Sequence, residues 1–300
     1  MKSKCRNNLI HQIAFLKNIK ENSADLSVKQ AKIADYILNH YNKVAFLTAA
    51  QLASEVKVSE STVIRLATSL GYKGYPEFQG DLRKIIVDQL TYTERLEISI
   101  HSESKNNLFN RTFLREVNNI QEAYKNISPD DFRAMVDVIS TSEKVFVAGL
   151  RASTCLAQYF TFQLRRIRKN VTGIIHGGKE SWDLIREGGP KDLLIAIAFP
   201  RYPRETVELV DFATNLKMRV AGITDRIVSP IARRCRPTLL ILSELVTFVD
   251  LYSAPLTLMA ALIAEVAVRH EKKSFACLGR FEDFVKESKL FYEMGRKEVM

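Results

Sequence analysis

Hydroxyl side chains and one arginine are concentrated at the start of a predicted short helix. Residues 49–70 have the apolar spacing of two helices joined by a tight turn at Lys57, where a glycine is usual. The amino end of the second helix in such a pair enters the major groove of DNA, where hydroxyl and guanidinium groups bind phosphates or base edges. An ordinary helical hairpin with serine caps is the alternative. The residues expected on the exposed side of the second helix are Ser59, Glu60, Ser61, Thr62 and Arg65.

A second group of candidate residues follows two predicted strands in the other half of the chain. The strand at 145–148 leads through a glycine into a helix, and the strand at 193–197 leads into a loop that contains arginines. Anions bind where a parallel strand ends beside a helix amino terminus, and guanidinium groups bind carboxylate or phosphate. Structural turn residues and surface or subunit-contact arginines are the alternative. We expect Thr206 to cap the helix that follows the loop. The candidate ligand-binding residues are Gly149, Arg151, Ala152, Ser153, Arg201, Tyr202, Arg204 and Thr206.

Other reactive residue types are scattered along the chain. The four cysteines form no CxxC pair and the five histidines form no metal-binding motif, so we predict no disulfide framework, no metal site and no cofactor. The candidate loops contain no evident histidine–glutamate pair for acid–base catalysis, so we predict no catalytic residues. The sequence contains no apolar segment long enough for a signal peptide or a membrane span, which predicts a cytoplasmic protein without a membrane partner.

The composition predicts a folded chain of two domains. At about 150 residues per domain, a chain of 300 residues accommodates two, with one large domain as the alternative. Hydrophobic residues make up 46% and charged residues 26%, which excludes a disordered chain, and the 12 glycines and 8 prolines exclude collagen-like and linker-dominated architectures. The net charge of +10 favours an acidic partner, with nucleic acid as the first candidate. The positive excess is divided between the two halves of the chain and does not locate the binding site.

The two halves of the chain predict different elements. Residues 1–90 contain helix signals, including capping boxes at 27–30 and 48–51. The later part alternates helices with short continuous apolar runs, which are typical of strands buried on both faces of a parallel sheet. We therefore predict an all-α helix-turn-helix domain at 1–90 and a polar linker at 91–107. The third segment, 108–300, is predicted to be an α/β domain with a flavodoxin-like parallel sheet flanked by helices, which binds the effector and mediates oligomerisation.

Residues 59–78 read SESTVIRLATSLGYKGYPEF and resemble the signature SxSTVxRxxxxLGxxGxxxF of the RpiR family of bacterial transcriptional regulators. In that family the string runs from the recognition helix into the next helix, and the resemblance covers roughly residues 9–90. The resemblance implies that this helix binds DNA. The residues that it places against DNA are Ser59, Ser61, Thr62 and Arg65, with Lys73 near the DNA backbone.

Residues 125–270 resemble the SIS (sugar isomerase) domain that follows the helix-turn-helix in RpiR-type regulators. In that domain a Gly-x-Gly-x-Ser turn and a Ser-x-Ser-Gly-x-Thr loop bind phosphosugars or related metabolites. Here Arg151 stands in place of the second glycine, and the loop at 198–206 is longer, lacks the serines and keeps Thr206. The resemblance implies a small sugar-related ligand. The added arginines favour an anionic one, such as a sugar phosphate or a sugar acid.

These features together predict a transcriptional repressor whose SIS-like domain senses a metabolite and which is not an enzyme. One helix-turn-helix reads few base pairs, so we expect a homodimer or homotetramer that binds double-stranded DNA at an inverted-repeat operator. The alternative is a phosphosugar isomerase-type enzyme whose N-terminal region serves as an assembly module. A third hypothesis, a metabolite-binding scaffold without DNA affinity, is disfavoured by the intact recognition helix.

Overall fold

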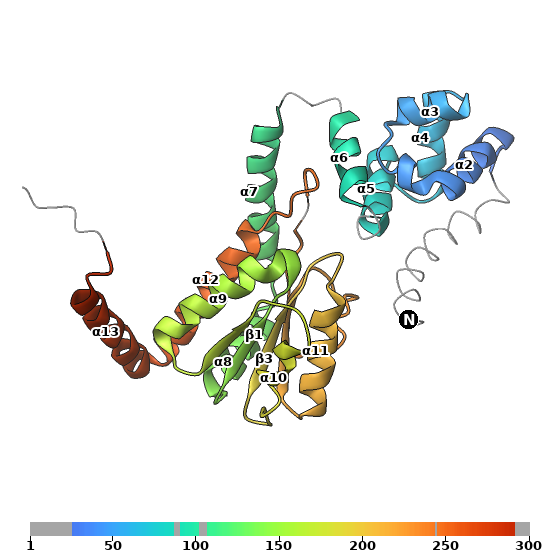
Figure 1. The fold of residues 1–300 in the computed structure, drawn as a ribbon. Coiled ribbons are helices and arrows are strands. Elements are labelled where there is room, and N and C mark those ends of the chain that lie inside the picture. The colour runs from blue at the N-terminus through green and yellow to red at the C-terminus, as the bar shows by residue number, and fades with distance from the viewer. Residues whose placement is uncertain (1–25, 87–90, 102–106, 244, 292–300) are drawn as a thin grey trace, which may run out of the picture. The chain divides into compact units, whose positions relative to one another are not determined.

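The computed structural model describes residues 26–86, 91–101, 107–243 and 245–291. The chain divides into two compact units, Met1–Leu108 and Phe109–Met300. In Figure 1 the described part of the first unit is a group of helices, and the second unit is a sheet covered by helices.

Serine and threonine caps set the start of the first two described helices, as the sequence predicts. The hydroxyl groups of Ser27 and Thr48 accept hydrogen bonds from the backbone N–H groups of Gln30 and Gln51, whose side chains bond back to the cap backbone. Each capping box satisfies two backbone donors that a helix start leaves free. The helices of this unit are α2 (Val28–Val44), α3 (Ala49–Val56), α4 (Glu60–Ser69), α5 (Tyr75–Ile86) and α6 (Tyr92–His101).

A small apolar core holds α3 and α4 in the helix-turn-helix arrangement. Both helices pack with α2 and α5 around this core. Ala53 is 4% exposed, and its carbonyl group accepts the N–H of Val58 at 2.9 Å, so it lies where the two helices meet. A larger side chain at this position would disturb the packing. The core includes Ile33, Ile37, Leu52, Ala53, Val56, Val63, Leu66, Leu70, Phe78 and Leu82.

Helix α6 occupies most of the polar segment predicted as a linker. The backbone N–H of Glu94 donates to the Thr91 hydroxyl at 3.2 Å, and the Glu94 carboxylate accepts the Thr91 N–H at 2.6 Å. These reciprocal bonds form a third capping box. The bonds that the Thr91 backbone N–H and hydroxyl donate to the Glu94 carboxylate lower the pKa of this group. The segment therefore contains a helix with its own start signal. Residues 102–106 of the predicted linker lie outside the described residues.

Five parallel strands form one sheet in the order β2-β1-β3-β4-β5. The chain runs outward from β1 to β2, then returns to β3 on the other side of β1 and continues to β4 and β5. This is the flavodoxin-like order, which reverses direction between β1 and β3. The predicted fold class is therefore confirmed. The strands are β1 (Val145–Ala148), β2 (Val171–Ile174), β3 (Leu193–Ile197), β4 (Arg219–Thr224) and β5 (Thr238–Leu240).

Helices cover both faces of this sheet (Figure 1). Val145 and Val147 of β1 pack with α8, α9 and α12, whereas Phe146 and Ala148 pack with α11 on the opposite face. All five residues of β3 are buried, as expected for a strand covered on both sides. The remaining elements are α7 (Leu108–Asn126), α8 (Pro129–Thr141), the short 3-10 helix η3 (Arg151–Ser153), α9 (Thr154–Ile167), α10 (Glu180–Asp183), α11 (Arg204–Asn215), α12 (Ser253–Arg269) and α13 (Glu271–Ser288).

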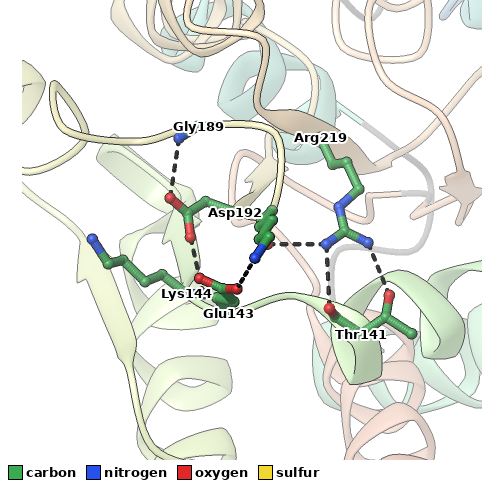
Figure 2. A network of polar contacts seen from close by, with 7 residues as sticks. Thr141, Glu143, Lys144, Gly189, Asp192 and Arg219 are labelled. Atoms are coloured by element: carbon green, nitrogen blue, oxygen red, sulfur yellow. Dashed lines mark hydrogen bonds and ion pairs between the residues drawn. The ribbon is translucent and has the colours of Figure 1, made fainter.

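A polar network connects the amino ends of the strands (Figure 2). The Asp192 carboxylate accepts backbone N–H bonds from Lys144 at 3.1 Å and from Gly189 at 3.0 Å. The guanidinium group of Arg219 donates to the Thr141 hydroxyl at 2.8 Å. Lys144, Asp192 and Arg219 lie at the starts of β1, β3 and β4, and the candidate ligand residues follow the opposite ends of the strands. We therefore assign the network to the stability of the fold.

Candidate functional site

Backbone hydrogen bonds around a lysine close the turn between α3 and α4. Lys57 has φ 59° and ψ 53°, the left-handed conformation that favours glycine. Its N–H donates to the carbonyl groups of Ala53 and Ser54, which ends α3. The chain then turns into Ser59, the N-cap residue of α4. The predicted turn therefore forms with a lysine in the position where a glycine is usual.

Hydroxyl and guanidinium groups form one connected chain at the start of α4. Ser59 Oγ lies 3.0 Å from Ser61 Oγ and 2.8 Å from Thr62 Oγ1. Arg65 donates from Nε to the Ser61 carbonyl oxygen at 3.2 Å and from Nη2 to the Ser61 hydroxyl at 3.3 Å. These contacts hold the four side chains at the positive end of the helix dipole. The arrangement presents donors of the kind that bind phosphates and base edges.

The residues predicted to face DNA separate into exposed and buried members. Thr62 is 9% exposed, and its hydroxyl contacts Ser59. The expectation that Thr62 is presented outward is therefore wrong. It lies four residues before the core residue Leu66, and that spacing places both on the same face of α4. The exposed members are Ser59, Glu60, Ser61, Arg65 and Lys73.

The candidate ligand residues of the second unit lie in the loops that follow β1 and β3. These strands are hydrogen-bonded neighbours, with Ala148 paired to Ala196, so their loops leave the same edge of the sheet. The loop after β1 leads to the amino end of α9, and the loop after β3 leads to the amino end of α11. Open α/β sheets bind ligands at such a reversal of strand order, and helix amino ends attract anions. The structure thus brings the two predicted loops to one edge.

The loop after β1 packs tightly against α9. A Cβ atom on Gly149 would lie 2.6 Å from the Ser153 carbonyl oxygen and 2.8 Å from the Ala157 Cβ atom, so a side chain there forces the helix away. Arg151 and Ala152 are exposed, and Arg151 has φ 58°. The arginine keeps the left-handed conformation for which glycine is the usual residue. The altered motif therefore retains a glycine-like turn.

Two hydroxyl residues begin α9. Ser153 is the N-cap residue and is 3% exposed, which confirms its predicted position at the start of the helix. Thr154, which the sequence analysis did not select, donates its hydroxyl toward the carbonyl groups of Gly149 and Ile175, each at 3.3 Å. Thr154 therefore ties the loop after β1 to the loop after β2. The sequence signal that could have identified Thr154 is its place in the first turn of a helix that follows a strand.

A buried carboxylate at the end of β4 positions the loop after β3. The Tyr202 hydroxyl donates to Asp225 Oδ1 at 2.6 Å, and Arg226 Nε donates to Asp225 Oδ2 at 2.5 Å. Asp225 is 6% exposed, whereas Arg201 is exposed and has φ 67°. Sequence reasoning did not select Asp225, and its only signal was an acid directly after a strand. The contact fixes Tyr202 across two neighbouring strands.

Helix α11 begins at Arg204, with Pro203 as its N-cap residue. The expectation that Thr206 caps this helix is therefore wrong, because Thr206 lies within the first turn. It is fully buried, and its hydroxyl has no hydrogen-bond partner among the residues that the structure describes. Arg204 donates from Nε to Glu208 at 2.6 Å along its own helix. The Arg204 guanidinium group is therefore engaged by a carboxylate.

A second carboxylate lies at the same edge of the sheet. A Cβ atom on Gly177, in the loop after β2, would lie 2.1 Å from Glu205 Oε2. Glu205 therefore packs directly on this loop, beside the residue that follows His176 in the sequence. The sequence does not bring Gly177 and Glu205 together, because Gly177 follows β2 whereas Glu205 lies at the start of α11, after β3. Histidine and glutamate are residue types that acid–base catalysis uses.

Several arginines of the second unit are engaged within the fold. Arg168 donates to the carbonyl groups of Ile139 and Ser142 at the end of α8, and burial lowers the pKa of its guanidinium group. Arg234 donates to Asp211 at 2.6 Å. These side chains satisfy a helix end and a carboxylate. They are therefore poor candidates for contacts with DNA or a ligand.

Three other kinds of function would require a reactive cysteine, a metal site or a membrane-spanning helix. Burial raises the pKa of the Cys235 thiol to about 12, so this cysteine is not a nucleophile at neutral pH. The described ranges contain no group of three His, Cys, Asp or Glu side chains able to hold a metal ion. None of the described helices combines the length and apolar character needed to cross a membrane.

Two family models match the chain, one in each half. "Helix-turn-helix domain, rpiR family" matches residues 13–88, and "SIS domain" matches residues 138–265. The first range contains α3, α4 and the turn between them. The second contains all five strands and the loops that carry the candidate ligand residues.

Curated relatives of the chain are named as HTH-type transcriptional regulators. The HTH-type transcriptional regulator YfhH of Escherichia coli is 26% identical over 214 residues, which cover 69% of this chain and 72% of YfhH. The HTH-type transcriptional regulator HexR of Pseudomonas aeruginosa is 24% identical over 231 residues, which cover 73% of this chain and 75% of HexR.

Solved structures share the fold. The sugar isomerase domain of an RpiR transcription factor from Sphaerobacter thermophilus has a TM-score of 0.57 and 24% identity, covering 59% of this chain and 98% of that one. NanR of Vibrio vulnificus, in complex with ManNAc-6P, has a TM-score of 0.56 and 20% identity, covering 93% of this chain and 100% of that one. The helix-turn-helix match, the SIS match and the named relatives agree. The chain belongs to the RpiR family of helix-turn-helix transcriptional regulators and carries a SIS domain.

Proposed function

We propose that the protein is a cytoplasmic repressor that binds an inverted-repeat operator in double-stranded DNA through α4. The observation that carries this proposal is the connected set of Ser59, Ser61 and Arg65, exposed at the amino end of the recognition helix. Serine hydroxyls there reach phosphates or bases, and the arginine reaches guanine or a phosphate. Glu60 is exposed in the first turn of α4 and Lys73 is exposed between α4 and α5, while Thr62 supports Ser59 from the inner side.

The proposal includes an even-numbered homo-oligomer, a homodimer or a homotetramer. An apolar stripe on α7, formed by Phe109, Phe113, Val117 and Tyr124, supports it. These side chains are 73%, 61%, 50% and 88% exposed, and their spacing places them on one face of the helix. A large exposed apolar stripe is typical of an interaction surface, and the same stripe on a second copy is self-complementary about a two-fold axis.

We propose that a small anionic metabolite binds between the loops after β1 and β3. The buried Thr206 hydroxyl, without a partner among the described residues, supports a polar ligand at the start of α11. Ser153 lies at the start of α9, and Arg151 and Arg201 are exposed on the two loops. NanR of Vibrio vulnificus is complexed with ManNAc-6P, so sugar phosphates are the first compounds to test and sugar acids the second. The proposed contacts are Gly149, Arg151, Ala152, Ser153, Arg201, Tyr202, Arg204 and Thr206.

A second candidate function is that of a phosphosugar isomerase with an N-terminal assembly module. One observation favours it: the Glu205 carboxylate packs against the loop that contains His176. Isomerisation needs a general base near the substrate carbon, and either residue type serves as one. The named relatives are regulators, which supports the first proposal.

A gel shift with the DNA upstream of the protein's own gene tests the proposed function. The full-length wild type should retard this DNA in preference to a scrambled duplex of equal length, and a sugar phosphate should change the retarded fraction. The ligand should be recovered unchanged, as followed by NMR. Equal retardation of both duplexes would contradict operator binding. Conversion of the ligand into an isomer would favour the enzyme.

A further inference from the structure

We propose that Lys57 contacts a backbone phosphate of the DNA duplex and thereby positions α4 in the groove. This inference rests on the proposed DNA binding. Lys57 is exposed and lies in the turn two residues before Ser59, the N-cap residue of α4. Neither the family signature beginning at Ser59 nor the predicted contact residues include it.

The turn itself does not require the side chain of Lys57. Its φ of 59° is unfavourable for a residue with a side chain, because the Cβ atom approaches the following carbonyl oxygen. Glycine adopts the same conformation without that crowding. The turn bonds to Ala53 and Ser54 use only the backbone of Lys57, so glycine would form them equally well. The lysine side chain therefore adds nothing to the closure of the turn.

The charges around Lys57 also favour an anionic ligand at this turn. The start of α4 is the positive end of a helix dipole, and Arg65 bonds back to Ser61 at this end. Glu55, an acid on the preceding helix, is already bonded by Lys43 at 2.8 Å. Lys57 forms no ion pair with any residue that the structure describes. The one acid in the first turn of α4 is Glu60.

A phosphate is the group that this positively charged turn would bind. It would neutralise Lys57 and accept bonds at the positive helix end, as anions at helix amino ends do. Lys57 precedes the helix, whereas residues that read base edges lie on the helix within the groove. Phosphate contacts fix the register of a protein on DNA but carry no sequence information. The contact should therefore strengthen binding to all duplexes alike.

Three substitutions separate the charge of Lys57 from its backbone conformation. Lys57→Gly removes the charge and the crowding, Lys57→Asn removes the charge and tolerates the left-handed region, and Lys57→Arg keeps the charge. Each full-length variant is titrated by fluorescence anisotropy against the upstream duplex and a random-sequence duplex over a range of salt concentrations. Thermal melting of the same variants reports folding.

Lys57→Gly and Lys57→Asn should reduce the slope of log affinity against log salt by about one on both duplexes. The advantage of the wild type should accordingly shrink about fourfold between about 50 and 200 mM salt. Lys57→Arg should keep the wild-type slope, and Lys57→Gly should melt at or above the wild-type temperature.

An unchanged slope in both uncharged variants would overturn the phosphate contact. A wild type that binds neither duplex would overturn the proposed DNA binding and the contact with it. Arg65→Ala, alone and combined with each Lys57 substitution, is titrated in parallel. Arg65→Ala should lose the preference for the upstream duplex, whereas each Lys57 substitution should change its salt slope as it changes that of the wild type.

Discussion

Arg65 and Lys73 are both exposed and positively charged, but they have different local settings. Arg65 lies on α4 and bonds to the Ser61 carbonyl at 3.2 Å, whereas Lys73 lies beyond the helix, before α5. We expect Arg65→Ala to lose the preference for operator over random DNA, because a base-edge contact is worth about 1–3 kcal/mol. Lys73→Ala should weaken binding to both duplexes about equally. Anisotropy titrations measure both effects, and a retained preference in Arg65→Ala would require a different orientation of α4.

The buried hydroxyl of Thr206 gives a second prediction for a single residue. A buried hydroxyl without a partner costs about 1–3 kcal/mol, so Thr206→Val should stabilise the ligand-free chain by about 1 kcal/mol. If the hydroxyl binds the ligand, the same variant should lose roughly tenfold in affinity for a sugar phosphate. Thermal melting and calorimetry measure the two effects.

Thr214 provides the matched control on the same helix. Its hydroxyl donates to the Val210 carbonyl at 2.8 Å, so Thr214→Val removes a bond that is made and should not stabilise the chain. Its ligand affinity should equal that of the wild type. Equal ligand affinity in Thr206→Val as well would remove Thr206 from the binding site.

The contact between α2 and α3 predicts a dependence of stability on pH. Glu55 on α3 accepts bonds from Lys43 and Tyr36 of α2, both at 2.8 Å, and the Lys43 bond is the main cause of its lowered pKa. A carboxyl whose pKa falls on folding stabilises the native state above its unfolded pKa, and this is lost as the pH falls through the folded value.

The melting temperature of the wild type should therefore decrease as the pH falls below 4.5, the ordinary value for this carboxyl. Glu55→Gln cannot ionise, so its melting temperature should decrease less over the same range. Thermal denaturation of the full chain, followed by circular dichroism, measures the difference between the two proteins. Parallel curves for wild type and variant would contradict the role of Glu55.

Elements were predictable where the signal is local. Continuous apolar runs located β1 and β3 at the residues where they occur, because strands covered on both faces need apolar side chains throughout. Capping boxes located α2 and α3. The same pattern at Thr91 and Glu94 marks α6, but the polar composition of that segment indicated a linker instead.

Contacts between loops were not predictable from spacing along the chain. Tyr202, after β3, bonds to Asp225, after the neighbouring strand β4. Glu205, after β3, contacts Gly177, after β2, although β1 lies between these two strands. Such pairs depend on strand order, which the apolar runs do not encode. The role of Thr206 was mistaken for a related reason, because its position in the helix depends on a start point that sequence patterns locate only to within a few residues.

Assembly gives a prediction for the whole molecule. The rings of Phe109 and Phe113 lie 4.7 Å apart on the exposed stripe of α7. If this stripe joins two copies, Phe113→Glu should shift the oligomer toward the monomer, because a buried unpaired charge is strongly unfavourable. Light scattering after size exclusion measures the mass. Val28→Glu is the control, since Val28 is 89% exposed in the first unit and its replacement should leave the mass unchanged.

A wild type that is monomeric at concentrations where DNA is bound would contradict the oligomer itself. A Phe113→Glu variant with the wild-type mass would contradict only the assignment of α7 to the interface. Because a two-fold operator needs two recognition helices, the monomeric variant should also bind the inverted repeat more weakly than the wild type does.

Regulation requires that binding at the proposed metabolite site and binding at the proposed DNA site are energetically coupled. Linkage makes this coupling reciprocal. If the ligand weakens DNA binding by a given factor, DNA weakens ligand binding by the same factor, commonly about 5- to 150-fold. Calorimetry of a sugar phosphate with and without operator, and anisotropy of the operator with and without the sugar phosphate, should give the same ratio. Arg201→Ala and Arg204→Ala should each weaken ligand binding, because both guanidinium groups are proposed ligand contacts. Equal ligand affinity in both variants and the wild type would make the two arginines structural, and a ratio of one would mean that the metabolite does not regulate DNA binding.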